Sequence, residues 1–360
     1  MAVALDCLYV TAGGACYARG NSISWGTGPL NAITAPAVKN GFRKVWVGSD
    51  SGELITLDAL NGNVFRSVSL GGIIYYTGCH GPNLIVSIDD GRLLAIDPET
   101  EVVRWSANFG PLGFVESAAE TMDVLTVGLN PGTAAALTTA FDANSGNILW
   151  QFPEERLMSR VKADSGVFYM ISSSNAPSML YAVRATDGFV IWNLAEPASL
   201  GNSWGPINVV GDTVFAGSEG QMLYALAAST GSIKWSAALP GYPGGLLQYS
   251  PAYPLLNFEA AVIAGFGSAL SASVAAFDPA TGTEKWLINF PTGTLGPIAP
   301  DMRFFTGYMA TRTATDGTAY SYSPNGQPSP FWGAPWSPGG PIYGMAFMPG
   351  EIVVLPTPSV

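Results

Sequence analysis

An eleven-residue window that ends in tryptophan recurs along this chain and constrains the fold more than any other feature of the sequence. One copy reads AFDPATGTEKW at residues 276–286. The other copies in the same register are AIDPETEVVRW (95–105), AFDANSGNILW (140–150), AVRATDGFVIW (182–192) and ALAASTGSIKW (225–235). These copies start 42 to 51 residues apart. A period of this length indicates a repeat architecture, in which each unit buries its apolar surface against its neighbours.

Three degenerate windows complete a series of eight, namely CYARGNSISW at 16–25, TLDALNGNVF at 56–65 and AYSYSPNGQPSPFW at 319–332. The aromatic residues that end the windows follow one another at intervals of 40 to 51 residues and are Trp25, Phe65, Trp105, Trp150, Trp192, Trp235, Trp286 and Trp332. Between them, apolar and polar residues alternate with a period of two and are interrupted by turn residues, which is typical of short strands. We therefore expect an all-β fold, an eight-bladed β-propeller of four-stranded antiparallel blades.

The segment from Trp204 to Trp235 shows the organisation of a blade most clearly, because its apolar runs predict strands at about 206–210, 213–217, 221–227 and 232–238. We expect a single propeller domain, 1–360, with blades at approximately 29–70, 71–110, 111–154, 155–197, 198–240, 241–291 and 292–338. The last blade combines 1–28 with 339–360, so that pairing of the N- and C-terminal strands closes the ring. One strand is surplus there, and the sequence leaves open whether it is 8–12 or 351–355.

The pattern Ala-x-Asp-x-x-x-Gly-x-x-x-Trp in these windows resembles the tryptophan-docking motif of the pyrroloquinoline-quinone-type (quinoprotein dehydrogenase-like) β-propeller repeat family, over essentially the whole chain. In that family the tryptophan packs between blades on a glycine peptide, and the aspartate forms hydrogen bonds within the turn before the outermost strand. The resemblance implies a docking role for the eight aromatic residues and for Gly146, Gly188, Gly231, Gly282, Asp58, Asp97, Asp142 and Asp278. The departures are Arg184 and Ala227 for aspartate, Glu101 for glycine, and Phe65 for a tryptophan one residue early.

Enzymes of the family hold a quinone and Ca²⁺ near the propeller axis and use an aspartate as base, so a dehydrogenase is one hypothesis. They commonly carry two adjacent cysteines, whereas Cys7, Cys16 and Cys79 are separated in this chain. Most aspartates lie beside a glycine or in the repeat motif, where a turn role is expected. The segment from Asp142 to Gly146 begins like a calcium loop, but no bidentate glutamate follows at the twelfth place. We expect no catalytic, cofactor-binding or metal-binding residues.

The remaining candidates for chemistry also favour structural roles. The single histidine, His80, precedes a Gly-Pro turn, and no Gly-x-Ser-x-Gly elbow accompanies it. Two carboxylate pairs could suggest glycoside hydrolysis, namely Asp89–Asp90 and Glu154–Glu155. Adjacent residues on a strand point to opposite faces, so the two carboxylates of such a pair cannot lie on either side of one glycosidic bond. The glycine pairs precede inner strands rather than helices and are Gly71–Gly72, Gly244–Gly245 and Gly339–Gly340. Within the aromatic group Phe331, Trp332, Trp336 and Tyr343, Trp336 is the candidate for stacking on a sugar.

Composition limits the partners. The formal net charge is −11, and no run of Lys or Arg could neutralise a string of phosphates, so nucleic acid is not an expected partner. No stretch reaches the roughly 18 apolar residues of a membrane-spanning helix. The N-terminus shows no secretory leader, and any export is therefore inferred from the family. Cys7 and Cys16 flank the turn of a predicted hairpin, and the sequence allows either a disulfide between them or two free thiols.

Only 11% of the residues are charged, which suits large neutral contact surfaces. The sequence therefore favours a non-enzymatic propeller that binds a protein partner through loops or an end face. In this it resembles the BamB-like, non-enzymatic branch of the family, and it would be a subunit or ectodomain of a larger secreted or envelope assembly. The alternatives are a quinoprotein-type dehydrogenase or sugar-binding enzyme with an axial site, and a structural unit of an extracellular filament or coat.

Overall fold

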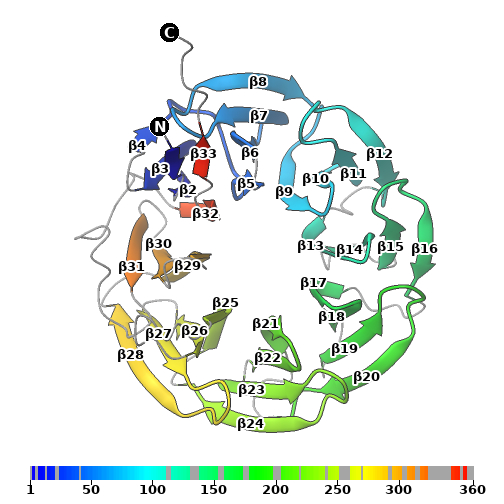
Figure 1. Cartoon of the computed structure of the whole chain (residues 1–360), viewed down its shortest axis with the longest axis vertical. Coiled ribbons are helices and arrows are strands. Elements are labelled where there is room, and N and C mark those ends of the chain that lie inside the picture. Colours follow the sequence, from blue (N-terminus) through cyan, green and yellow to red (C-terminus); the bar gives the residue numbers. More distant parts are fainter. Residues whose placement is uncertain are drawn as a thin grey trace. The chain divides into compact units, whose positions relative to one another are not determined.

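The computed structural model confirms the all-β fold: the protein is an eight-bladed β-propeller, and every regular element among the described residues is a strand (Figure 1). The described residues are 2–4, 7–12, 14–20, 24–39, 42–110, 115–129, 138–152, 158–172, 178–197, 204–218, 220–239, 242–250, 260–268, 271–290, 294–301, 306–312, 317–322, 342–348 and 352–354. Seven four-stranded sheets and one three-stranded sheet form the blades in this part of the chain. Within a sheet, successive strands pair antiparallel.

Blades two to five occupy the first half of the chain. Blade two contains β5 (Ala37–Val38), β6 (Lys44–Gly48), β7 (Glu53–Asp58) and β8 (Val64–Ser69). Blade three contains β9 (Ile74–His80), β10 (Asn83–Ile88), β11 (Arg92–Ile96) and β12 (Val103–Asn108). Blade four contains β13 (Val115–Thr121), β14 (Val124–Leu129), β15 (Thr139–Asp142) and β16 (Ile148–Gln151). Blade five contains β17 (Met158–Asp164), β18 (Val167–Ser172), β19 (Met179–Arg184) and β20 (Val190–Ala195).

Blades six to eight follow in the same order. Blade six contains β21 (Trp204–Val210), β22 (Thr213–Ser218), β23 (Met222–Ala227) and β24 (Ile233–Ala238), so its predicted strands are confirmed within two residues. Blade seven contains β25 (Tyr242–Ser250), β26 (Ala261–Ser268), β27 (Ser271–Phe277) and β28 (Glu284–Phe290). The described strands of blade eight are β29 (Thr294–Asp301), β30 (Thr306–Arg312) and β31 (Gly317–Tyr322).

The two ends of the chain join in blade one, as the sequence predicts. Its strands are β32 (Ile342–Met348), β2 (Cys7–Ala12), β3 (Ala15–Gly20) and β4 (Ser24–Gly26), in that order. The surplus strand is the C-terminal one, because β33 (Ile352–Val354) pairs with β1 (Ala2–Ala4) in a separate two-stranded sheet. The blade therefore closes on backbone hydrogen bonds between distant parts of the chain, which removes two sheet edges.

The register of the β2–β3 hairpin answers the question of a disulfide. Cys7 lies opposite Gly20, whereas Cys16 lies opposite Thr11. The two cysteines are therefore about four residues, or roughly 13 Å, apart along the hairpin. A disulfide requires Cα atoms within about 7 Å, so the register is incompatible with one between Cys7 and Cys16.

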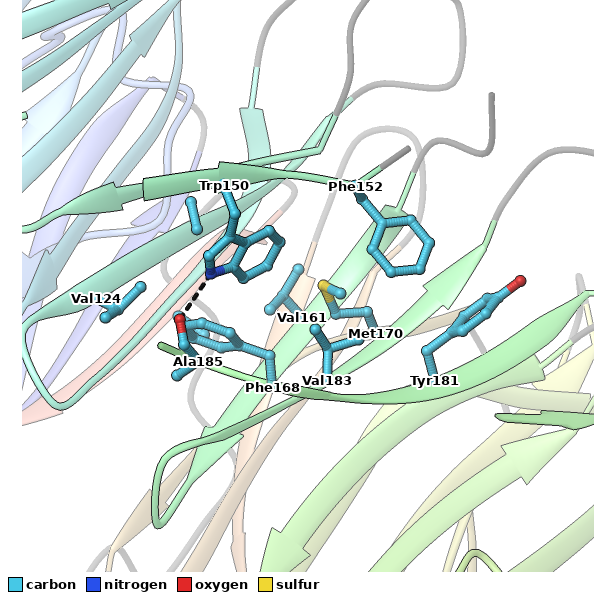
Figure 2. Packing of buried hydrophobic residues seen from close by; sticks show 11 residues of the cluster. Val124, Trp150, Phe152, Val161, Phe168, Met170, Tyr181, Val183 and Ala185 are labelled. Atoms are coloured by element: carbon cyan, nitrogen blue, oxygen red, sulfur yellow. Dashed lines mark hydrogen bonds between the residues drawn. The ribbon is translucent and has the colours of Figure 1, made fainter. Parts of the chain in front are cut away.

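The core lies between blades rather than inside any one of them. Figure 2 shows one such cluster, in which Trp150 and Phe152 of blade four pack with Phe168, Met170 and Tyr181 of blade five. Blade sheets are too thin to bury both of their faces, so each large side chain completes its burial on the next blade.

The chain divides into two compact units. The first consists of residues 1–78, 296–323 and 327–360, and the second consists of residues 79–295 and 324–326. The first unit contains blades one and two, and the second contains blades four to seven. The blade boundaries and the extent of a single domain stay predictions.

Candidate functional site

Five of the window-ending tryptophans form the same hydrogen bond. Each indole Nε1 donates to a backbone carbonyl in the turn that precedes the outermost strand of the following blade. The bonds are Trp25 to Ala59 (3.1 Å), Trp105 to Ala143 (3.0 Å), Trp150 to Ala185 (2.7 Å), Trp192 to Ala228 (2.7 Å) and Trp235 to Pro279 (2.8 Å). Figure 2 shows the bond of Trp150. Because an indole has one donor, this geometry satisfies it while the ring is covered.

A glycine of the same turn lies against each of these indoles. At Gly188, where φ is +72°, a Cβ atom would come within 2.9 Å of the Trp150 ring. The equivalent glycines have φ between +71° and +74° and are Gly62, Gly146, Gly231 and Gly282. Only glycine combines this backbone conformation with such close approach. The sequence pattern had marked four of these five positions, and Gly62 belongs to the degenerate window at 56–65.

The motif aspartates hold the same turns from within. The Asp142 carboxylate accepts hydrogen bonds from the backbone N–H groups of Asn144 and Ser145, at 3.2 and 2.7 Å. The Ser145 hydroxyl and these N–H donors hold the pKa of Asp142 below its usual range. Asp278 accepts equivalent bonds from Ala280 and Thr281.

Asp58 and Asp97 add an arginine to this arrangement. Burial alone would raise the pKa of Asp58, but the hydrogen bonds and charge of Arg43 hold that pKa low. The Thr100 N–H and the Arg104 guanidinium lower the pKa of Asp97. Each of these carboxylates thus forms hydrogen bonds with its turn and an arginine, and its lowered pKa makes it a weaker base.

The assignment of Phe65 to the docking position is wrong. In the five windows that keep the eleven-residue register, the tryptophan pairs with the motif alanine, as in Ala182↔Trp192, and the residue before it is a β-bulge. In blade two the partner of Thr56 is Arg66, and the bulge falls on Phe65. A bulge residue has no cross-strand partner, so Phe65 occupies the place that Arg104 or Leu149 occupies elsewhere.

The other departures are accommodated locally. Glu101 adopts φ +59° in place of glycine. Arg184, which replaces an aspartate, pairs with Asp187 of its own turn at 2.8 Å. Trp286 lies on β28 and is half-buried, and Trp332 lies outside the described residues.

The candidates for other chemistry do not converge in the described structure. Among the residues that the structure describes, no group of three His, Cys, Asp or Glu side chains could hold a metal ion. Asp90 pairs with Arg92 at 2.7 Å, and Gly71 lies in a loop with φ +78°. Gly244–Gly245 lie within β25, and Tyr343 lies on β32. The residues Glu154–Glu155, Phe331, Trp336 and Gly339–Gly340 lie outside the described part.

His80 and its neighbours lie where the inner strand of a blade turns into the second strand. Burial, together with the positive charge of Lys162 on β17, lowers the pKa of His80 to about 4. Lys162 is exposed to solvent. Partial desolvation by the surrounding protein nevertheless lowers the pKa of its ammonium group. The Glu120 carboxylate would lie 2.9 Å from a Cβ atom at Gly81, beside His80. These charged groups thus border the first turns of blades three to five, and His80 is neutral at pH 7.

These turns interlock from blade to blade. The Gly166 N–H donates to Thr121 Oγ1 at 3.1 Å, and the Met122 sulfur would lie 2.6 Å from a Cβ atom at Gly166. Met122 is nevertheless 67% exposed, and both it and Asp123 adopt positive φ, at +53° and +60°. A side chain in this region costs about 1 to 2 kcal/mol per residue. We name the surface formed by residues 80–82, 120–123 and 165–166 the turn face.

Sequence reasoning had not identified the turn face. The residue types of Met122 and Asp123 are ordinary, and only their backbone conformation and exposure distinguish them. A methionine at the tip of a two-residue turn, where Asn-Gly is the usual sequence, is the one signal that could have found it.

Known proteins resemble this chain at the level of family and fold. The family model described as outer membrane protein assembly factor BamB matches residues 66–195 and 134–296, well over half of the chain. The outer membrane protein assembly factor BamB of Nitrosomonas eutropha is 31% identical over 148 residues, 38% of this chain and 32% of that protein. The matched segment therefore spans about a third of the relative's length.

Two solved structures show the same fold. The crystal structure of BamB from Moraxella catarrhalis aligns with a TM-score of 0.65 at 18% identity and covers 92% of each chain. A europium-containing methanol dehydrogenase aligns with a TM-score of 0.64 at 11% identity, over 87% of this chain and 80% of that one. Among the described residues no helix is long and apolar enough to cross a membrane.

Proposed function

This chain belongs to the family of the outer membrane protein assembly factor BamB, and on that premise we propose that it is a non-enzymatic scaffold that binds protein partners through its turn face. We place it in the cell envelope, as an exported subunit of a larger assembly. The name of the Nitrosomonas eutropha relative, an assembly factor, supports this class of role. The low charge and the turn-bonded aspartates support binding rather than catalysis.

The observation that carries the proposal is the strained, exposed turn at Met122–Asp123. Its backbone would be more stable with Asn or Gly at both positions, yet a large apolar side chain occupies the tip and is 67% exposed. Strain of this kind persists where the residue serves another purpose. A flexible thioether is well suited to a protein contact surface, because it adapts to different partners.

The proposal is tested by replacing Met122 with asparagine, which removes the exposed apolar side chain and relieves the backbone strain of the turn. We expect Met122→Asn to raise stability by about 1 kcal/mol and to weaken partner binding at least tenfold. The matched control is Gln221→Asn, which relieves φ +60° at the turn between the second and third strands of blade six. This control should gain stability and keep its partner.

Binding would be measured by immobilising the full chain, capturing proteins from an envelope extract of the source cells, and titrating the purified captured protein. Equal affinity for the wild type and Met122→Asn would contradict the turn face as the binding site. A saturable gain in melting temperature with pyrroloquinoline quinone and Ca²⁺ would instead support the dehydrogenase alternative, whose fold is shared.

A further inference from the structure

In blades three and six, a cation on the outermost strand holds the turn between the first and second strands. Lys234 Nζ donates to the Asp212 carbonyl at 3.1 Å and to Thr213 Oγ1 at 2.7 Å. Its ammonium also pairs with the Asp212 carboxylate at 2.9 Å. Arg104 donates in the same way to the Pro82 carbonyl, at 3.3 Å. The residue before the motif tryptophan thus reaches inward, to the first turn of its own blade.

Blade four keeps the carboxylate of this arrangement but not its cation. The two-residue turn between β13 and β14 ends in Asp123, as the turn between β21 and β22 ends in Asp212. The residue before the tryptophan is Leu149 in blade four, where blade six has Lys234. Asp123 therefore occupies the position of Asp212, and an apolar side chain stands at the position of the cation.

The Asp123 carboxylate is not used within the described structure. Asp123 is exposed, and none of the ion pairs between described residues includes it. Its backbone is held instead: the N–H donates to Glu120 Oε1 at 2.9 Å, and the carbonyl accepts from the Ala143 N–H at 2.7 Å. The turn thus has a fixed backbone and a negative charge, which is complementary to a cation on a partner.

Exposed apolar side chains accompany this carboxylate. Met122, directly before Asp123, is 67% exposed, and Leu149 is 45% exposed. Lysine and arginine carry a charged head on an aliphatic stem, and the stem packs along apolar surface while the head stays in a polar environment. Blade six shows how a cation binds such a turn, because Lys234 reaches Asp212 from the register position of Leu149.

We propose that Asp123 binds a lysine or arginine side chain of the protein partner. The partner's cation takes the place that Lys234 holds in blade six, and its aliphatic stem packs on Met122 and Leu149. The proposal rests on the proposed scaffold function and specifies the partner chemistry at the turn face. Blade five has no such subsite, because its turn between β17 and β18 ends in Gly166, which carries no carboxylate.

The probe is a pentapeptide of sequence GLKLG, blocked at both ends, and the control is the same peptide with an acetylated lysine side chain. Each is titrated into the full chain labelled with carbon-13 at its methionine methyl groups. We expect a saturable shift of the Met122 methyl signal with the first peptide and at least tenfold weaker binding of the acetylated one. Equal affinities, or no shift of this signal, would overturn the proposal.

The variants transfer the arrangement of blade six to blade four. Leu149→Lys supplies the missing cation from within the chain and should weaken binding of the GLKLG peptide at least tenfold, as should Asp123→Asn. The matched control is Ile191→Lys, the same change at the equivalent bulge of blade five, where Gly166 offers no carboxylate. It should bind like the wild type. Unchanged binding to Leu149→Lys, or an equal loss in Ile191→Lys, would overturn the proposal.

The scaffold function is measured separately, with the protein captured from the envelope extract. If Leu149→Lys keeps the captured protein that Met122→Asn loses, and the peptide does not distinguish the variants, only the cation subsite is refuted. If the peptide binds at Asp123 while the captured protein binds Met122→Asn as tightly as the wild type, the turn face is refuted as the binding site of that protein instead.

Discussion

Trp150 and Phe65 end windows of similar appearance but have opposite environments. Trp150 is 9% exposed, and its Nε1 bonds to a carbonyl of the next blade. Phe65 is 54% exposed and sits on a bulge, while Arg66 takes the register position of a tryptophan. The comparison shows that the register of the outermost strand, rather than the presence of an aromatic residue, decides which side chain enters the space between blades.

The largest effect is expected when the buried aromatic is removed. We predict that Trp150→Ala lowers the free energy of unfolding by about 3 to 5 kcal/mol, because it leaves a cavity in the cluster with Phe168. The measurement is the shift of the urea midpoint. A loss below about 1 kcal/mol would mean that this junction contributes little to the fold.

The glycine under the indole is the next most sensitive position. We predict that Gly188→Ala costs about 2 to 4 kcal/mol, since the new Cβ meets both a positive φ and the Trp150 ring. The control is Gly211→Ala, where φ is +57° but no atom lies within 4 Å of the new Cβ. Its cost should be about 1 kcal/mol. Equal losses in denaturant titrations would refute the indole contact.

The turn aspartate should act in a pH-dependent way. The folded state lowers the pKa of Asp142 through Ser145 and backbone N–H groups, so its stabilising effect is present above the unfolded pKa of about 3.9. It is lost as pH falls through the lower folded pKa. We therefore expect Asp142→Asn to be less stable than the wild type at pH 6, with a gap that closes below about pH 3.

The measurement for this prediction is thermal melting across that pH range. Asp50→Asn, an exposed aspartate outside the windows, serves as the control and should show a smaller gap at pH 6. A gap for Asp142→Asn that stays constant down to pH 2 would show that the carboxylate charge does not stabilise the turn.

The smallest effect is expected at Phe65. Because the bulge leaves its ring exposed, Phe65→Ala should change stability by less than about 0.5 kcal/mol. Calorimetric melting of this variant beside Trp150→Ala sharpens the comparison directly. A loss similar to that of Trp150→Ala would restore Phe65 to the docking position.

The sequence predicts the propeller because its signals are local and repeated. The period of the windows, the alternation between them and the turn glycines all point to the same blades, and the strands of blade six are correct within two residues. The glycines at 146, 188, 231 and 282 lie with positive φ in the turns before the outermost strands, each against an indole of the preceding blade. Closure by the chain ends was also foreseen, from unpaired strands at each terminus.

What the sequence did not predict depends on register and backbone conformation. A one-residue bulge moved the docking position from Phe65 to Arg66, and residue types alone do not report it. The positive φ of Met122 became meaningful only beside the equivalent turns of other blades. Functional surfaces of a scaffold consist of ordinary residues in particular places, so no motif marks them.

The most direct test of the scaffold account is hydrogen exchange of the full chain with and without its captured partner. The account predicts slowed exchange at residues 120–124 and 165–167, on the turn face. Slowed exchange confined to the opposite turns, such as residues 220–222, with none at the turn face, would contradict it.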